Sequence, residues 1–252
     1  MPDQTSKHEA AHPRDAKPAP GQPTTERVQG IFSNIAARYD LLNTLTSLGM
    51  HRVWRRSAVR FAEVKPDDQV LDLCAGTGDL ALAIARYGRP KSVLGTDFVP
   101  EMLEVAEHKL ADYHGSTKLC FQQADAQALP LGDQSFDLVT VGFGVRNLPD
   151  RSANFREVLR VLKPGGRYVI LEFTQPPSRF FKTLYRLYNR NVLPTLGALI
   201  AGDRASYQYL NDSIEKFPAA PALAAELKAA GFSSVTWKLM TFGVVAVHKA
   251  VK

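Results

Sequence analysis

The chain has 252 residues, of which 45% are hydrophobic and 22% charged, and its formal net charge is +6. This size and composition predict one globular α/β domain with additions, large enough to bury a sizeable core. No apolar run approaches the roughly 18 residues of a membrane span, and the N-terminus has no apolar signal core, so we expect a cytoplasmic protein. The small positive excess is typical of a soluble protein. No dense basic run carries interleaved aromatic residues, so we expect no nucleic-acid partner.

The N-terminal part of the chain divides into a tail and a helical segment. Residues 1–23 are rich in Pro, Lys, His and Ala with almost no large apolar residue, which predicts a disordered tail. From Val28 to Val64 apolar residues recur at helical spacing, which predicts about three short helices. We interpret residues 24–64, which include Tyr39, as a helical cap over a ligand site within a single domain of residues 24–252. A basic cluster in this segment is typical of a solvated helix face: Arg52, Arg55, Arg56 and Arg60.

A glycine turn follows the first predicted strand. Residues 70–81 read V-L-D-L-C-A-G-T-G-D-L-A, an apolar run that breaks at Gly76, Thr77 and Gly78 just as a helical pattern begins. The glycines allow a sharp turn and the close approach of a ligand, and the free amides of the first helical turn attract a polar or anionic group. This pattern alone is weak evidence for a nucleotide site.

The second predicted strand, Ser92 to Phe98, adds a carboxylate. Asp97 stands 19 residues after Gly78, where a doubly wound sheet places the acid that binds both ribose hydroxyls. Asp72, at the end of the first strand, would repel a pyrophosphate and attract an ammonium group. S-adenosylmethionine (SAM) has an ammonium, a carboxylate and a ribose but no phosphate, so the pattern favours SAM over NAD. Asp72 as a plain strand-end cap is the alternative.

Two further strands end in residues that suit this ligand. Leu119 to Ala124 is a predicted strand that ends at Asp125 and Ala126, where an acid accepts the adenine amino proton and a small residue leaves room for the ring. Phe136 to Phe143 is the next strand, and it runs into Arg146 and Asn147. Between these strands the sequence predicts a helix over Pro100–Ala111.

The C-terminal half completes the pattern of an α/β sheet. A predicted helix, Arg151 to Leu162, stops at the turn Lys163 to Gly166, and the fifth strand covers Tyr168 to Phe173. Residues 213–230 read as largely helical, and residues 234–249 alternate like two strands joined near residues 241–243. These elements predict a doubly wound, mostly parallel seven-stranded sheet with a C-terminal antiparallel hairpin, the Rossmann-like fold of class I methyltransferases.

Residues 176–215 form a predicted helical insertion over the substrate site. From Pro176 to Gly202 the pattern is aromatic and basic around an apolar face, which fits a helix at a membrane interface. A buried capping helix is the alternative. Cys74 and Cys120 stand at predicted strand ends and are interpreted as reduced core residues. Neither the cysteines nor the six histidines have metal-ligand spacing, so we expect no metal.

Over roughly residues 28–249 the chain resembles the quinone C-methyltransferases that methylate demethylmenaquinol or the ubiquinone precursor. The motifs that carry the resemblance are Tyr39-Asp40-x-x-Asn43 with Ser47, His51 and Trp54; Phe143-Gly144-Val145-Arg146-Asn147; Arg160 to Arg167 with Leu171 to Thr174; and Ala201-Gly202-Asp203 with Ser206-Tyr207-x-Tyr209-Leu210. The resemblance implies SAM as cofactor, menaquinone biosynthesis as the most fitting role, and a prenylated quinol as partner. It leaves open a homodimer and an association with the inner face of the membrane.

The resemblance implies that Thr77, Asp97 and the pair Asp125-Ala126 contact SAM. Three departures from the family pattern stand at Gly142, where serine is frequent, at Leu42, where methionine is usual, and at Phe242, where a small residue is usual. The last two are expected to reshape the quinone pocket. The full set of predicted SAM-binding residues is Asp72, Gly76, Thr77, Gly78, Asp97, Phe98, Asp125, Ala126 and Gly142.

The predicted chemistry needs an ionised quinol oxygen, because a neutral hydroquinone is a poor carbon nucleophile. Arg146 is the candidate that lowers the pKa of this oxygen, directly or through a water. Asn147 would hydrogen-bond the ring oxygen, and Tyr39 would approach from the cap. The alternative for Arg146 is an ion pair with Glu172, and both can hold.

Two other classes of protein stay open at this level. An RNA or protein methyltransferase would share the whole SAM half. A SAM-binding module without catalysis would bind the cofactor alone. The sequence also does not choose between a naphthoquinol and the benzoquinol of the ubiquinone pathway.

Overall fold

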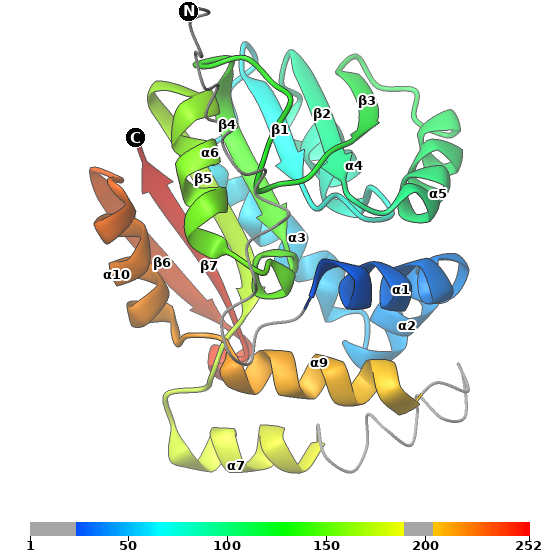
Figure 1. Ribbon diagram of the computed structural model, residues 1–252, viewed down its shortest axis with the longest axis vertical. Coiled ribbons are helices and arrows are strands. Elements are labelled where there is room, and N and C mark those ends of the chain that lie inside the picture. The colour runs from blue at the N-terminus through cyan, green and yellow to red at the C-terminus, as the bar shows by residue number, and fades with distance from the viewer. Residues whose placement is uncertain (1–23, 189–203) are drawn as a thin grey trace, which may run out of the picture.

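The computed structural model describes residues 24–188 and 204–252. Its centre is a seven-stranded sheet in the order β3-β2-β1-β4-β5-β7-β6 (Figure 1). Neighbouring strands are parallel from β3 to β5, whereas β7 is antiparallel to both β5 and β6. The strands are β1 (Gln69–Leu73), β2 (Ser92–Asp97), β3 (Lys118–Gln123), β4 (Phe136–Gly142), β5 (Leu162–Phe173), β6 (Ser234–Met240) and β7 (Val245–Val251).

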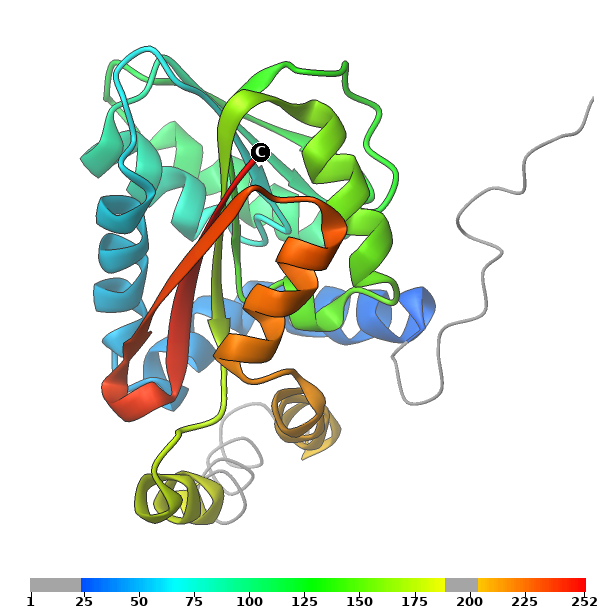
Figure 2. The same ribbon diagram turned by 90° about the vertical axis from the view of Figure 1, so that its left-hand side faces the viewer.

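Helices cover both faces of this sheet (Figure 2). On one face α3 and α4 pack on the strands, with Trp54 and Val59 against Val70. On the other face α6 and α10 pack on the strands, with Phe155 and Leu223 among the buried side chains. The helices are α1 (Thr25–Ile35), α2 (Tyr39–Thr46), α3 (Met50–Ala62), α4 (Asp79–Ala83), α5 (Pro100–Ala111), α6 (Arg151–Val161), α7 (Arg179–Leu187), α9 (Arg204–Lys216) and α10 (Ala220–Ala230), with the short turns η2 (Ala36–Arg38), η3 (Ile84–Gly88), η4 (Val145–Asn147) and η6 (Thr241–Gly243).

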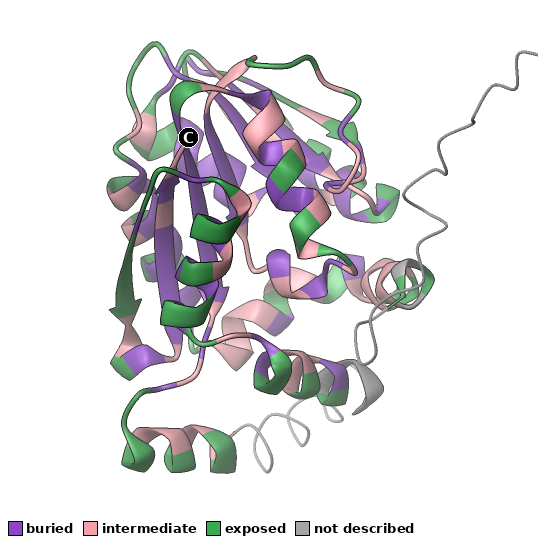
Figure 3. Ribbon diagram, turned by 60° about the vertical axis from the view of Figure 1, so that its left-hand side comes forward, coloured by how far each residue is buried: buried purple, intermediate pink, exposed green. Residues whose placement is uncertain are grey.

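The central strands are buried on both faces, as their continuous apolar runs predict. Val70 and Leu71, which are neighbours in β1, point into opposite core clusters and are both fully buried. In Figure 3 the middle of the sheet is buried, while the helices expose one side. Burial of each large aliphatic side chain contributes about 1.5–3 kcal/mol to stability.

The predicted fold class is confirmed, since the sheet is seven-stranded and mostly parallel with an antiparallel C-terminal pair. One expected helix, over residues 213–230, is in fact two. The first, α9, ends at Lys216, and α10 begins at Ala220 with a proline in its first turn. Pro218 and Pro221 lack the amide hydrogen that a continuous helix requires, so the chain turns between them.

Cys120 differs from its predicted place in the core. It lies in β3, an edge strand of the sheet, and its side chain is exposed. Successive side chains of β3 point to opposite faces of the sheet, and Leu119 is buried on one face whereas Lys118 and Cys120 are exposed on the other. Cys74 is half-buried, and both thiols are free.

Several predicted segments lie outside the described residues. These are the tail of residues 1–23 and, within the helical insertion, residues 189–203, which include the motif Ala201-Gly202-Asp203. The division of the chain into a tail and one domain therefore stays a prediction. Among the described helices, none has the length and apolarity needed to cross a bilayer.

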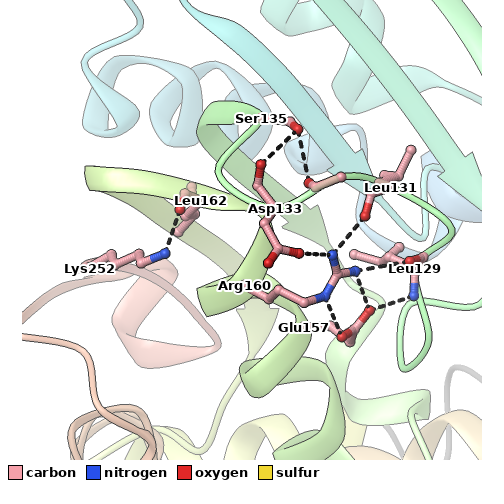
Figure 4. Close-up of polar contacts among 9 residues, drawn as sticks. Leu129, Leu131, Asp133, Ser135, Glu157, Arg160, Leu162 and Lys252 are labelled. Atoms are coloured by element: carbon pink, nitrogen blue, oxygen red, sulfur yellow. Dashed lines mark hydrogen bonds and ion pairs between the residues drawn. The ribbon is translucent and has the colours of Figure 1, made fainter.

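Arg160, from one of the family motifs, has a structural role (Figure 4). Its guanidinium donates to the carbonyl oxygens of Leu131 at 2.7 Å and of Leu129 at 3.0 Å. The same group pairs with Glu157 at 2.8 Å and Asp133 at 2.7 Å. Arg160 thus joins the loop that precedes β4 to helix α6.

Gly78→Ala is expected to destabilise the protein more than Gly165→Ala. Both glycines have a positive φ, 77° and 72°, which costs an alanine on the order of 1 kcal/mol. A Cβ at Gly78 would also stand 2.7 Å from Phe121 Cζ and 3.0 Å from Ala106 Cβ, whereas a Cβ at Gly165 meets nothing within 4 Å. Overpacking adds about 1–3 kcal/mol. Urea unfolding of the two variants measures the difference in the free energy of unfolding. Equal losses of stability would show that the turn after β1 shifts to accommodate the added methyl group at no cost.

Candidate active site

Two hollows meet at the carboxyl ends of the parallel strands, where α1 and α2 lie (Figure 1). The first, here called the strand-end cleft, has an empty volume of about 730 Å³ including open solvent at its mouth. The second, here called the cap cavity, measures about 1030 Å³ on the same basis. Phe32, Tyr39 and Phe143 line both. Ligands in the two hollows can therefore meet beside these three side chains.

Asp97 is fixed at the end of β2, in the lining of the strand-end cleft. Its Oδ2 accepts the Gly76 amide at 2.7 Å, and its Oδ1 accepts the Val99 amide at 2.9 Å. Each oxygen keeps a further lone pair, so the carboxylate can accept two neighbouring hydroxyls such as those of a ribose. Burial raises the pKa of Asp97, while these amides oppose the shift.

The residues predicted from the third and fourth strands border the same cleft. Asp125 is oriented by the Gln127 amide, which donates to its Oδ1 at 2.8 Å. A Cβ at Gly142 would stand 3.0 Å from Leu80 Cδ2, so a serine there would need that side chain to shift. Six predicted SAM contacts line the cleft: Gly76, Asp97, Phe98, Asp125, Ala126 and Gly142.

The other three predicted contacts, Asp72, Thr77 and Gly78, do not line the cleft. Thr77 is 1% exposed, and its hydroxyl donates to Asp40 Oδ1 at 2.7 Å and accepts Lys109 Nζ at 3.0 Å. Gly78 faces the side chain of Phe121. Direct contact of these three residues with SAM stays a prediction.

Asp72 is fully buried in β1. Its Oδ1 accepts the Thr140 hydroxyl at 2.6 Å, and its Oδ2 has no hydrogen-bond partner. Burial raises its pKa to about 7, partly opposed by Thr140. An ammonium group would be attracted only to the ionised form, so at neutral pH the carboxyl is poised between the two states.

Arg146, in η4 directly after β4, lines the cap cavity and is almost entirely buried. Its Nη1 pairs with Glu172 Oε1 at 3.0 Å, so the ion pair that was the alternative role is present. Its Nε donates to Ser213 Oγ at 3.3 Å. Burial raises the pKa of Glu172, and Arg146 opposes that shift. The guanidinium is thus neutralised by the protein and still faces the cavity.

Phe143 separates the two hollows and has a strained backbone. Its φ is 60°, a value that bulky residues rarely adopt. Its carbonyl oxygen accepts Arg146 Nη1 at 2.5 Å and Asn147 Nδ2 at 3.4 Å. The two predicted catalytic residues therefore also hold this peptide in place, and such strain is typical of functional sites.

The other predicted catalytic groups lie on either side of this junction. Asn147 borders the strand-end cleft, and its Oδ1 accepts the hydroxyl of Tyr209, which lines the cap cavity, at 3.0 Å. Tyr39 lines both hollows, and burial raises its pKa while Arg146 opposes the shift. The structure thus gathers Tyr39, Arg146 and Asn147 around the junction.

A charged network ties the cap to the glycine turn. Asp40 of α2 accepts Thr77 and pairs with Lys109 at 2.5 Å. Lys109 also pairs with Asp79 at 2.6 Å, and Asp79 pairs with Arg55 at 2.8 Å. Arg55 was predicted on a solvated face, but it is buried because this ion pair draws it inward. The network fixes α2 and α3 over the cleft.

The cap cavity is mainly apolar and aromatic. Trp54 is positioned by its Nε1, which donates to Thr241 Oγ1 at 2.8 Å, and its ring packs on Phe143 and Phe173. Leu42, one of the family departures, lines the cavity. Phe242, another of these departures, does not line the cavity. Its ring stacks on the ring of Phe181, with the ring centroids 4.3 Å apart.

The sequence analysis predicted a helical insertion over the substrate site at residues 176–215, but it assigned no residue of that segment to the site. Tyr185 and Tyr188 come from the end of α7, and Tyr209, Leu210 and Ile214 come from α9. Tyr188 also donates its hydroxyl to the Thr46 carbonyl at 3.1 Å. The spacing of Tyr185 and Tyr188 marks one helix face, but nothing local shows what that face covers. Among the described residues, no cluster of three or more His, Cys, Asp or Glu could hold a metal.

The strand order and a cleft with an acid at each of two neighbouring strand ends define the fold of class I SAM-dependent methyltransferases. The solved structure of a SAM-dependent methyltransferase from Thermotoga maritima has this fold, with a TM-score of 0.63 at 18% identity, covering 88% of this chain and 99% of that one. The chain belongs to the ubiE/COQ5 methyltransferase family, whose model matches residues 22–252. The predicted methyltransferase class is confirmed.

Two relatives match nearly their whole length. The demethylmenaquinone methyltransferase of Thermus thermophilus is 50% identical over 218 residues, which are 86% of this chain and 98% of the relative. The ubiquinone/menaquinone biosynthesis C-methyltransferase UbiE of Teredinibacter turnerae is 42% identical over 228 residues, 90% of this chain and 92% of the relative.

Asp72→Asn is expected to make the protein more stable at pH 8 and nearly unchanged at pH 4. Because the folded pKa is raised to about 7 from 3.8, the folded state holds a proton that the unfolded state releases. The stability from this proton is complete below about pH 4 and is lost as the pH rises to about 7, by roughly 4 kcal/mol. Urea unfolding at both pH values measures it. An equal effect of the substitution on the free energy of unfolding at both pH values would show that Asp72 does not titrate between them.

Proposed function

We propose that this chain binds SAM in the strand-end cleft and transfers its methyl group to a ring carbon of a prenylated quinol in the cap cavity. The substrate proposed first is demethylmenaquinol, which the reaction converts to menaquinol. The observation that carries the proposal is that the strand-end cleft, which holds Asp97 and Asp125, and the aromatic cap cavity adjoin at Phe32, Tyr39 and Phe143.

The side chains of the strand-end cleft suit the parts of SAM. Asp97 offers two oriented oxygens for the ribose hydroxyls. Asp125, with Ala126 beside it, offers an acceptor and space for the adenine. When bound there, SAM supplies an electrophilic methyl group on a good leaving group, so the protein has to align the acceptor carbon and make it nucleophilic.

The cap cavity suits an apolar aromatic ring that carries polar oxygens. Its lining is dominated by aromatic and aliphatic side chains, and it also holds the guanidinium groups of Arg55 and Arg146. A neighbouring guanidinium lowers the pKa of a phenol by about one to three units. Arg146 would therefore stabilise the ionised quinol oxygen, and Glu172 keeps its guanidinium oriented.

The naphthoquinol is placed first because the relative of 50% identity carries the demethylmenaquinone name. A second candidate is the 2-methoxy-6-polyprenyl-1,4-benzoquinol of ubiquinone biosynthesis, since the relative of 42% identity is named for both pathways. The two rings differ in width, and the shape of the cap cavity has to decide between them.

The purified protein is expected to methylate a short-tailed demethylmenaquinol in the presence of SAM, and the double variant Arg146→Met, Glu172→Gln is expected to lose turnover by about 10- to 1,000-fold. Both members of the Arg146–Glu172 ion pair are replaced, because replacing only one would leave the other as an unpaired buried charge. Mass spectrometry follows the product, and calorimetry checks that SAM still binds.

The matched control for this variant is Arg156→Met, because Arg156 is 68% exposed and lines neither hollow. Near-normal turnover of the double variant would remove Arg146 from the mechanism. Methylation of the benzoquinol alone would favour the second candidate. SAM binding without methylation of either ring would refute the proposed function.

The quinol is proposed to arrive from a lipid surface on which α7 docks. Helix α7 lies at one end of the molecule (Figure 1), and its Tyr185 lines the cap cavity. The opposite stripe of this helix, Phe180, Leu184 and Leu187, is 53–72% exposed. Arg179, Lys182 and Arg186 flank that stripe, and basic residues beside an apolar helix face are typical of binding to anionic lipid.

Phe180→Glu with Leu184→Glu is expected to release the protein from vesicles that contain phosphatidylglycerol, because it places two charges on the apolar stripe. Co-sedimentation measures the bound fraction. The matched control is Tyr87→Glu, at an exposed aromatic position of 54% away from α7. If the unsubstituted protein does not sediment with vesicles, α7 is a capping helix and no lipid contact exists.

A further inference from the structure

His51 lies in the cap cavity, and the reaction proposed above gives it no role. It is the second residue of α3, is 5% exposed, and lines the cavity. Its Nδ1 lies 2.7 Å from Ser47 Oγ. No hydrogen-bond partner of its Nε2 is found among the described residues, and this atom is not among the fully buried ones that lack a partner.

The contacts of Ser47 decide which nitrogen of His51 carries the proton. Ser47 has one hydroxyl hydrogen, and its Oγ lies 2.6 Å from the Asn43 carbonyl oxygen, which can only accept. That hydrogen therefore points to Asn43. Ser47 Oγ then accepts from His51, whose ring nitrogen Nδ1 must carry a hydrogen, and the lone pair of Nε2 is free.

The imidazole also borders a second, charged cleft on the outer side of α3. This outer cleft is open to solvent and is lined by Asp40, Arg52, Arg55, Asp79 and Lys109 as well as His51. A proton accepted on the cavity side therefore has a path to water that does not cross the apolar cavity.

The other titratable groups in the described lining are poorer proton acceptors at neutral pH. Arg55 and Arg146 hold no lone pair for a proton, and both are ion-paired. The tyrosines of the lining are Tyr39, Tyr185, Tyr188 and Tyr209, and burial raises the pKa of Tyr39 and of Tyr188 above the ordinary value of a phenol.

We propose that His51 is the catalytic base of this site, and that its Nε2 accepts the hydroxyl proton of the bound quinol while Ser47 holds the ring in the required tautomer. This inference rests on the proposed function, since it assigns a role in quinol methylation. Arg146 then stabilises the oxygen that His51 deprotonates.

The protons and electrons balance as follows. The quinol O–H bond breaks, its proton goes to Nε2, and its electron pair stays on oxygen. The ring carbon forms a bond to the methyl carbon, and the methyl–sulfur bond breaks with its electron pair on sulfur. The hydrogen on that ring carbon leaves to water as a proton, which restores the aromatic ring. The oxygen takes up a proton from water, and His51 releases its own proton to water through the outer cleft, so one proton is released in net for each methyl group.

The charges around His51 keep it in its basic form. Burial lowers its pKa below the ordinary value, and Arg55 and Arg52 on its own helix lower it further. Asp79 of α4 and Asp40 of α2 oppose this shift, but both carboxylates are already paired with Lys109. Since the neutral imidazole is the active form, turnover is expected to fall as the pH drops through this lowered pKa.

His51→Gln is expected to lower kcat by about 10²- to 10⁴-fold with SAM binding unchanged, and to remove the acidic limb of the pH profile. A ring-chlorinated quinol, whose hydroxyl ionises without a base, should recover most of the loss. A purely structural role would reduce turnover of both quinols equally. His108→Gln, at an exposed histidine of α5, is the control.

Three results would overturn the inference: near-normal turnover of His51→Gln, an acidic limb that persists in it, or the same deficit with both quinols. Nitrogen NMR of the unsubstituted protein tests the tautomer of His51 without turnover, and it should show a protonated Nδ1 and an unprotonated Nε2. In Ser47→Ala, which removes the acceptor for Nδ1, this tautomer should no longer be the single form. If the unsubstituted protein methylates no quinol, the proposed function fails, and that result is distinct from a failure of His51.

Discussion

A buried guanidinium at the end of the fourth strand needs a partner, and this requirement organises the site. Glu172 from the neighbouring strand neutralises Arg146, and the pair is almost fully removed from solvent. Arg146 then donates to the Phe143 carbonyl, which holds a strained peptide between the two hollows. Without the carboxylate, a lone buried charge would be costly. One ion pair therefore fixes the junction and places a guanidinium in the lining of the cap cavity.

The cap completes this arrangement by a separate set of charges. Asp40 joins α2 to Thr77 in the glycine turn and to Lys109 in α5, and Arg55 joins α3 to Asp79 in α4. These contacts connect the helices that line the cap cavity to the elements that shape the strand-end cleft. The cap is thus positioned by the same residues that surround the start of α4, which joins the cap cavity to the strand-end cleft.

The two hollows differ in origin: the strand-end cleft is formed by the sheet, and the cap cavity is formed mainly by helices outside it. The strand-end cleft takes its shape from the ends of β1, β2, β3 and β4, which any sheet of this order provides. The cap cavity depends on α1, α2, α3, α7 and α9, whose aromatic side chains come from outside the sheet. Resemblance to a solved methyltransferase at 18% identity therefore concerns the fold, while the shape of the cap cavity depends on residues such as Trp54 and Tyr209.

The sequence by itself determined the strands, the glycine turn and the places of Asp97 and Asp125, because apolar periodicity and short spacings are local properties of the chain. Only the tertiary structure decided that Arg55 and Asp72 are buried, that Arg146 is paired, and which faces of α7 and α9 line the cavity. Those features depend on segments far apart in the chain. A helix pattern shows that a face exists, but the packing partner that covers it is set by the whole fold.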